Sequence, residues 1–221
     1  MRLHLVGGFL GSGKTTAIIQ AARRLMSRGL RVGVVTNDQG KYLVDTAFFR
    51  LSDIPAVEVT GGCFCCNYAD LDQSLDQLVE SARPDVIFAE SVGSCADLVA
   101  TVVKPLLALK AAEAGPASFS VFADARLLRR RLLDQPLPFS EDVIYIFDKQ
   151  IEEAGLMVVN KADLLDAAVL YETVSLLQAR YPGKAALAQN SLAEDGVDAW
   201  LARLDAGAAL LSHESLEIDY A

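Results

Sequence analysis

The stretch Gly8-Phe-Leu-Gly-Ser-Gly13-Lys14-Thr15 matches the phosphate-loop pattern G-x-x-x-x-G-K-[ST]. Residues 3–6 (LHLV) precede it as a short apolar run that predicts a strand, and residues 15–28 have the spacing of a helix. In this context backbone N–H groups and a helix N-terminus converge on phosphate oxygens. The stretch therefore predicts a nucleotide-binding domain in which a strand feeds directly into a helix.

The side chains of this loop have separate expected roles. Lys14 is expected to reach the β- and γ-phosphates and to act in catalysis, and the Thr15 hydroxyl is expected to bind Mg²⁺. The loop residues expected to contact the nucleotide are Gly8, Gly11, Ser12, Gly13, Lys14, Thr15 and Thr16.

Outward from the loop, short apolar runs alternate with amphipathic stretches. Strands are expected at residues 3–6, 31–36, 56–59, 85–89, 118–123, 156–159 and 185–188. Helices are expected at residues 15–28, 69–82, 95–110 with an interruption at Pro105, from Arg126 onward, 167–180 and 197–204. This alternation predicts an α/β fold of the P-loop NTPase type, with a mostly parallel sheet and helices on both faces.

A second motif, Asn160-Lys161-Ala-Asp163, ends the valine-rich run at residues 156–159. The Asp163 carboxylate is placed to accept hydrogen bonds from guanine N1–H and N2–H₂, and adenine offers no such pair of donors. The Lys161 stem is expected to lie along the base, and Asn160 to bind back to the phosphate loop. Together with the phosphate loop, this motif favours GTP over ATP, because an unpaired buried polar group costs ~1–3 kcal/mol.

Two acidic residues end further strands. Asp38 follows the second predicted strand, and Glu90 ends the apolar run at 85–89, with Gly93 three residues later. Ligands of open parallel sheets bind where strands end. We therefore expect Asp38 and Glu90 to hold Mg²⁺ or the attacking water, and the Gly93 N–H to sense the γ-phosphate.

The segment Gly61-Gly-Cys63-Phe-Cys65-Cys66 holds three of the four cysteines. Near-adjacent cysteines are poorly placed for mutual disulfides, and thiolates favour soft ions such as Zn²⁺. Three ligands would leave a fourth position open, which suits a site that passes its metal on. Cys95 is interpreted as a core residue, with a role as fourth ligand left open.

Composition excludes several classes of protein. The chain has 221 residues with a net charge of -9, which argues against nucleic-acid binding. The N-terminus has no basic region followed by a long apolar stretch, so neither a signal peptide nor a membrane span is expected. Clustered free cysteines favour a reducing, cytoplasmic location.

In this order, GFLGSGKTT, TNDQG, GGCFCC, ESVG and NKAD resemble the motifs of the CobW-like GTPases, relatives of UreG and HypB. The resemblance covers residues 1–204. It implies GTP-dependent delivery of a metal, zinc or alternatively cobalt, to a client metalloprotein. The metal would bind at Cys63, Cys65 and Cys66. Lys41 departs from the family, which usually has an acidic residue there.

The sequence is therefore interpreted as a GTPase metallochaperone that uses GTP, Mg²⁺ and a thiophilic metal. Two other interpretations remain open: a nucleotide-binding metal sensor or storage module, and a P-loop kinase for a small molecule. A client metalloprotein is the expected partner, and a homodimer is left open.

Residues 1–206 are expected to form the P-loop domain, and residues 207–221 a tail. The resembling family usually has a C-terminal domain, often with histidine-rich stretches, and this chain has two histidines. The tail is either the end of a short family member or the start of such a domain.

Overall fold

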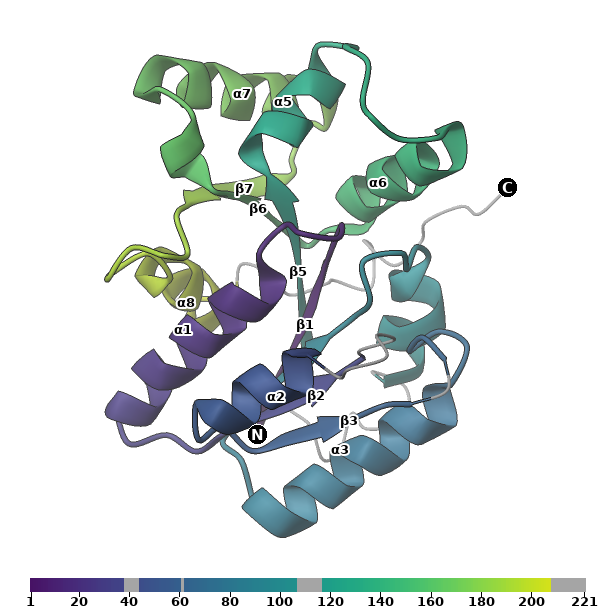
Figure 1. The fold of residues 1–221 in the computed structure, drawn as a ribbon, viewed down its shortest axis with the longest axis vertical. Coiled ribbons are helices and arrows are strands. Elements are labelled where there is room, and N and C mark those ends of the chain that lie inside the picture. Colours follow the sequence, from purple (N-terminus) through teal and green to yellow (C-terminus); the bar gives the residue numbers. More distant parts are fainter. Residues whose placement is uncertain (38–43, 61, 107–116, 208–221) are drawn as a thin grey trace.

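The computed structural model describes residues 1–37, 44–60, 62–106 and 117–207. Seven strands form one sheet in the order β3-β2-β4-β1-β5-β6-β7, and every neighbouring pair is parallel (Figure 1). The strands are β1 (Arg2–Gly8), β2 (Val32–Thr36), β3 (Ala56–Glu58), β4 (Val86–Glu90), β5 (Ala117–Asp124), β6 (Leu156–Asn160) and β7 (Ala185–Gln189). The predicted α/β fold with a parallel sheet is confirmed.

The strand β1 is central, because β4 pairs with it on one side and β5 on the other. The chain leaves β1 toward β2 on the β4 side, and it later crosses back to β5 on the opposite side. The strand order thus reverses next to β1, and in open parallel sheets such a reversal opens a crevice at the carboxyl ends of the strands. The phosphate loop follows β1 at that crevice.

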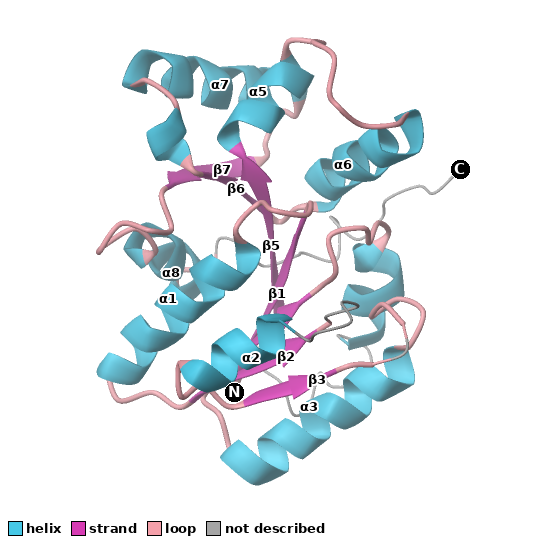
Figure 2. Cartoon of the chain, in the orientation of Figure 1, coloured by secondary structure: helices cyan, strands magenta, loops and turns pink. Residues whose placement is uncertain are grey.

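Helices cover both faces of the sheet (Figure 2). One face packs against α1 (Lys14–Ser27), α2 (Val44–Leu51) and α8 (Asp198–Asp205), with Trp200 fully buried at its centre. The other face packs against α3 (Tyr68–Ala82), α5 (Ala125–Leu132), α6 (Glu141–Glu153), α7 (Ala167–Arg180) and the π-helical turn η1 (Val99–Val103). Two apolar clusters on opposite faces make this a three-layer α/β domain.

The structure corrects the expectations about helices at several points. The sequence interpretation did not include α2 or α6, whose buried side chains, such as Phe49 and Phe147, acquire partners only in the fold. The helix expected from residue 95 instead follows Asp97, which has a positive φ of 59°. The turn η1 comes just before Pro105, and this described stretch ends one position after it, so the interruption expected at Pro105 stays a prediction.

Some expectations fall outside the described residues, namely those on Asp38, on Lys41 and on the tail from residue 208. Among the described residues, no helix is both long enough and apolar enough to cross a membrane.

Candidate nucleotide and metal site

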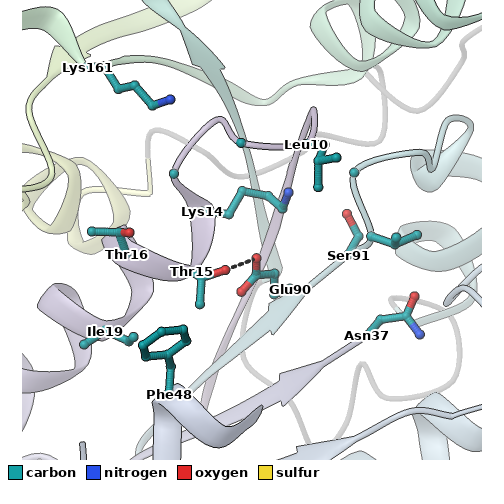
Figure 3. A pocket seen from close by; sticks show the side chains of 14 residues that line it. Leu10, Lys14, Thr15, Thr16, Ile19, Asn37, Phe48, Glu90, Ser91 and Lys161 are labelled. Atoms are coloured by element: carbon teal, nitrogen blue, oxygen red, sulfur yellow. Dashed lines mark hydrogen bonds between the residues drawn. The ribbon is translucent and has the colours of Figure 1, made fainter. Parts of the chain in front are cut away.

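A cavity of about 700 Å³ opens at the carboxyl ends of β1, β2 and β4. Figure 3 shows its side chains: Lys14 and Thr15 come from the start of α1, Glu90 and Ser91 from the end of β4, and Asn37 from the end of β2. Its lining residues are Leu10, Gly11, Gly13, Lys14, Thr15, Thr16, Ile19, Asn37, Phe48, Glu90, Ser91, Val92, Gly93 and Lys161. The size suits a nucleotide-scale ligand.

The phosphate loop wraps back on itself between β1 and α1. The Lys14 ammonium donates a hydrogen bond to the Gly8 carbonyl at 2.8 Å, and Lys14 is buried. Gly13 has a positive φ of 91°, and a Cβ there would lie 2.5 Å from the Asn160 amide nitrogen. Only glycine therefore fits at this position, where the loop turns into the helix.

The end of β4 meets the start of α1. The Thr15 hydroxyl donates to Glu90 Oε1 at 2.8 Å, and Glu90 is 4% exposed. A hydroxyl and a carboxylate at this distance form the kind of all-oxygen donor set that Mg²⁺ prefers. The two residues expected to hold Mg²⁺ within the described chain are thus side by side (Figure 3).

Gly93 packs directly against the phosphate loop. A Cβ at Gly93 would lie 2.6 Å from the Leu10 backbone nitrogen, so the two backbones are in close contact. The Gln150 side chain, from α6, donates to the Gly93 carbonyl at 3.0 Å and to the Cys95 carbonyl at 2.7 Å. The turn after β4 is therefore held between the phosphate loop and α6.

The second motif lies on the other side of the phosphate loop. The Asn160 amide donates to the Ser12 carbonyl at 2.8 Å, and its oxygen accepts from the Ser191 hydroxyl at 2.8 Å. Asn160 thus connects the phosphate loop to the segment that follows β7. The tie from Asn160 to the phosphate loop that the sequence indicated is present.

Lys161 and Asp163 occupy the turn after β6. Lys161 lines the cavity in a left-handed conformation, and its ammonium contacts Asp124 Oδ2 at 3.1 Å. Burial raises the pKa of Asp124, but Arg126 and Lys161 outweigh burial and lower that pKa to about 2. Asp163 is exposed, and the structure does not place it among the residues that line the cavity.

The three clustered thiols lie on the connection between β3 and α3. The Sγ atoms of Cys63, Cys65 and Cys66 all lie within 4.8 Å of one another. Cys63 and Cys65 are 2.8 Å apart, and Cys65 and Cys66 are 4.0 Å apart. The Asn67 and Cys66 N–H groups both donate to the Cys63 carbonyl, which folds the loop into a tight turn.

The thiols differ in how readily they ionise. Burial raises the pKa of Cys63, but hydrogen bonds from Cys65 and Cys66 outweigh burial and lower that pKa to about 7. Burial and the neighbouring Cys63 raise the pKa of Cys65 to about 12. Cys63 is therefore the most readily ionised thiol of the three, and a bound cation would favour ionisation of the others.

Cys95 is buried, as expected of a core residue, but it also touches the cluster. Its side chain is 3% exposed and its Sγ lies 4.0 Å from that of Cys65. This contact joins residues 30 positions apart in the chain. The sequence interpretation left a ligand role for Cys95 open, and the structure brings it within contact of a proposed ligand.

Asn37 is a site residue that the sequence reasoning passed over. It lines the nucleotide cavity, and its amide donates to the Val59 carbonyl at 3.0 Å and the Gly62 carbonyl at 2.7 Å. Gly62 directly precedes Cys63. An asparagine at the carboxyl end of a strand was the available signal, because ligands of parallel sheets bind there.

Sequence comparison places these features among known proteins. The CobW/HypB/UreG nucleotide-binding domain matches residues 2–189. A zinc chaperone CobW from Sinorhizobium sp is 29% identical over 194 residues, covering 75% of this chain and 52% of that protein. The zinc chaperone YeiR of Escherichia coli (strain K12) is 31% identical over 169 residues, covering 73% of this chain and 47% of that protein. The chain thus spans about half the length of these two relatives.

Solved structures share the fold. HypB from Helicobacter pylori, crystallised in complex with nickel, has a TM-score of 0.66 at 15% identity and covers 96% of this chain and 91% of its own. An LAO/AO transport system kinase has a TM-score of 0.59 at 20% identity, covering 98% of this chain and 62% of its own. At these identities the likeness concerns the P-loop fold.

Proposed function

This chain belongs to the CobW/HypB/UreG family of nucleotide-binding domains, and from that premise we propose that it is a GTP-hydrolysing metallochaperone. Its cargo is a thiophilic metal, zinc in the first place, delivered to a client metalloprotein. The similarity to two zinc chaperones, CobW of Sinorhizobium sp and YeiR of Escherichia coli, supports this choice of cargo.

In the proposed reaction the phosphate loop holds the β- and γ-phosphates. Lys14 exchanges its bond with the Gly8 carbonyl for the phosphate oxygens, and Thr16 and the loop N–H groups orient them. Thr15 and Glu90 would hold Mg²⁺, which neutralises charge on the phosphates when it is bound. Glu90 is also assigned the orientation of the attacking water against the γ-phosphate.

Base selection is assigned to the turn after β6. Asp163 accepts the two guanine donors, Lys161 covers the base with its alkyl stem, and Asn160 fixes the turn to the phosphate loop. The hydrogen bonds of Asn160 support the proposal, because a turn that must read a base needs to be held at a fixed distance from the phosphates.

The cargo site is assigned to Cys63, Cys65 and Cys66. Their Sγ atoms converge within 4.8 Å, which is compatible with three sulfur ligands around one soft cation. Binding would displace thiol protons to solvent, because the metal ligand is the thiolate.

One observation carries the link between the two sites. Asn37 reaches from the nucleotide cavity to the Gly62 carbonyl, next to the first metal-binding cysteine. A change in the position of Asn37 on nucleotide exchange would therefore move the backbone at Cys63. Coupling of this kind is reciprocal, so metal must alter nucleotide affinity by the same factor.

The proposal is tested on the full chain by GTP turnover and zinc titration of wild type and Cys65→Ser. We expect GTP hydrolysis by wild type, tight zinc binding by wild type, and loss of tight zinc binding in Cys65→Ser with GTP binding retained. Ser52→Ala, a surface change in the loop after α2, serves as the control and should leave both activities intact. Zinc binding that survives in Cys65→Ser would remove the proposed cargo site.

A further inference from the structure

The family motif accounts for three of the four cysteines, and the fourth has no assigned role. Cys95 follows β4 in the turn that begins after Glu90. It is 3% exposed, and its Sγ lies 4.0 Å from Cys65 Sγ. Cys95 therefore contacts one thiol of the three-cysteine group, although it comes from a different strand end.

The spacing of these sulfurs comes part of the way to a four-thiolate zinc site. Zn–S bonds of ~2.3 Å at tetrahedral angles place neighbouring sulfurs ~3.8 Å apart. Cys65 lies 4.0 Å from Cys66 and 4.0 Å from Cys95, so two of the six edges of such a tetrahedron are near their required length. The 2.8 Å edge from Cys63 to Cys65 must lengthen, and Cys95 must move closer to the other thiols, because of these four only Cys63, Cys65 and Cys66 lie mutually within 4.8 Å.

The backbone of Cys95 is held in place on its other side. The Cys95 carbonyl accepts from the buried Gln150 side chain at 2.7 Å, and the Leu98 N–H donates to Glu153 Oε2 at 3.0 Å. Both partners belong to α6. A backbone fixed in this way presents the thiol to the cluster without a search through many conformations.

A buried cysteine often serves only as a small apolar side chain. Packing accounts for the burial of Cys95, but it does not require the sulfur to meet the one other group of thiols in the described chain. A role as metal ligand explains why the Cys95 sulfur contacts Cys65, whereas packing alone gives no reason for this contact.

We propose that Cys95 is a fourth thiolate ligand, which closes the metal site and connects it to the γ-phosphate side of the nucleotide site. This inference rests on the proposed function. Gly93, two residues earlier, is packed against Leu10 of the phosphate loop. Gln150 binds the carbonyls of both Gly93 and Cys95, so a shift of this turn together with Gln150 on nucleotide exchange also shifts Cys95, and the site alternates between four sulfur ligands and three. A three-ligand site has an open position for a client ligand.

The test uses Co²⁺ as a spectroscopic probe on the reduced full chain, because cobalt–thiolate charge transfer reports the number of bound sulfurs. Wild type, Cys95→Ser and the packing control Val99→Ala are compared. Val99 is buried in the same apolar cluster and carries no sulfur. Cys95→Ala, which places no hydroxyl in the core, replaces Cys95→Ser if the serine variant does not fold.

We expect Cys95→Ser to lose one thiolate contribution to the cobalt band and Val99→Ala to retain the wild-type band. Zinc affinity should fall at least ~10-fold in Cys95→Ser, since losing even an outer-shell partner of a ligand costs 10–100-fold. The ratio of zinc affinities with a GTP analogue and with GDP should move toward one. Equal cobalt spectra in wild type and Cys95→Ser would overturn the proposal.

Cys65→Ser distinguishes a failure of the proposed function from a failure of the fourth-ligand proposal. If Cys65→Ser abolishes metal binding and Cys95→Ser changes nothing, the metallochaperone function stands and the fourth ligand is wrong. If wild type itself binds no Co²⁺ or Zn²⁺, the proposed function fails, and with it the role of Cys95.

Discussion

The phosphate loop and the cysteine segment both follow the carboxyl ends of parallel strands, but they are built differently. The phosphate loop is fixed by hydrogen bonds to its backbone, from Lys14 to the Gly8 carbonyl and from Asn160 to the Ser12 carbonyl. The cysteine segment is a short turn whose thiols contact one another. Backbone geometry therefore determines the shape of the nucleotide site. The metal site depends on side chains, whose sulfur atoms must move apart when a metal binds.

If the phosphate loop is preorganised, the loss of its one cation should have the largest effect. Lys14→Ala should lower GTP turnover by ~10²–10³-fold or more, because removal of a single preorganised donor already costs that much. Phosphate release is the measurement, with circular dichroism to check the fold. Lys149→Ala, which removes a half-buried lysine of α6 that pairs with Glu152, is the matched control and should turn over GTP like wild type. Comparable rates in both variants would contradict the role of Lys14.

The base-reading turn after β6 is tied to the phosphate loop by Asn160. Exchanging a single atom of Asp163 should therefore have a large effect on nucleotide affinity. Asp163→Asn replaces an acceptor-only carboxylate with an amide and should weaken GTP binding ~10–100-fold, with a relative gain for XTP. Asp166→Asn, at the N-terminal cap of α7, makes the same exchange three residues later and should not alter base choice. The test is to measure the GTP and XTP affinities of both variants by titration. Unchanged GTP affinity in Asp163→Asn would show that another group reads the base.

The connection between the rigid and the adaptable region should depend on Asn37. Asn37→Ala removes the bonds to the Val59 and Gly62 carbonyls and should shrink the effect of nucleotide on zinc affinity by ~2–30-fold. Asn67→Ala, directly after the cysteine segment, loses bonds to the Thr60 carbonyl and the Asp70 carboxylate and should change zinc affinity equally in both nucleotide states. If both variants behave alike, Asn37 supports the turn and does not transmit the nucleotide state.

The sheet beneath both regions should respond to mild acid through His4. His4 is buried on β1, and burial lowers its pKa from 6.5 to about 4. Because its folded pKa lies below the unfolded value, the stability that neutral His4 contributes is fully present above pH 6.5. It is lost as the pH falls toward 4. Between pH 7 and 5.5 we expect a loss of about 1 kcal/mol in unfolding free energy. His4→Gln should flatten this slope, and an equal slope in wild type and variant would exclude His4 as its origin.

The same difference between the two regions explains which parts of the site could be predicted from the sequence alone. The phosphate loop and the Asn160 motif are contiguous stretches whose geometry follows from local backbone chemistry, so their place at the ends of β1 and β6 could be predicted. The contact of Cys95 with Cys65 joins two strand ends, and the bonds from Gln150 to the Gly93 turn come from α6. Such contacts depend on strand order and helix packing, which no local pattern in one sequence specifies.

The two missed helices illustrate the same limit. In α6 the apolar side chain of Ile151 and the polar side chain of Gln150 are adjacent and both buried, because Gln150 finds backbone carbonyls inside the fold. A buried glutamine interrupts the apolar spacing that identifies a helix in sequence. Gln150, which obscures α6 in the sequence, is also the residue that binds the turn between the nucleotide site and the thiols.

The central claim is that nucleotide state and metal affinity are linked in this one domain. The direct measurement is a competitive zinc titration of the reduced wild-type chain with Mg²⁺, once with a non-hydrolysable GTP analogue and once with GDP. A coupling of ~1–3 kcal/mol predicts zinc affinities that differ ~5–150-fold between the two states, with zinc shifting the ratio of nucleotide affinities by the same factor. Equal zinc affinity in both states would contradict delivery driven by GTP and would favour a storage or sensor role.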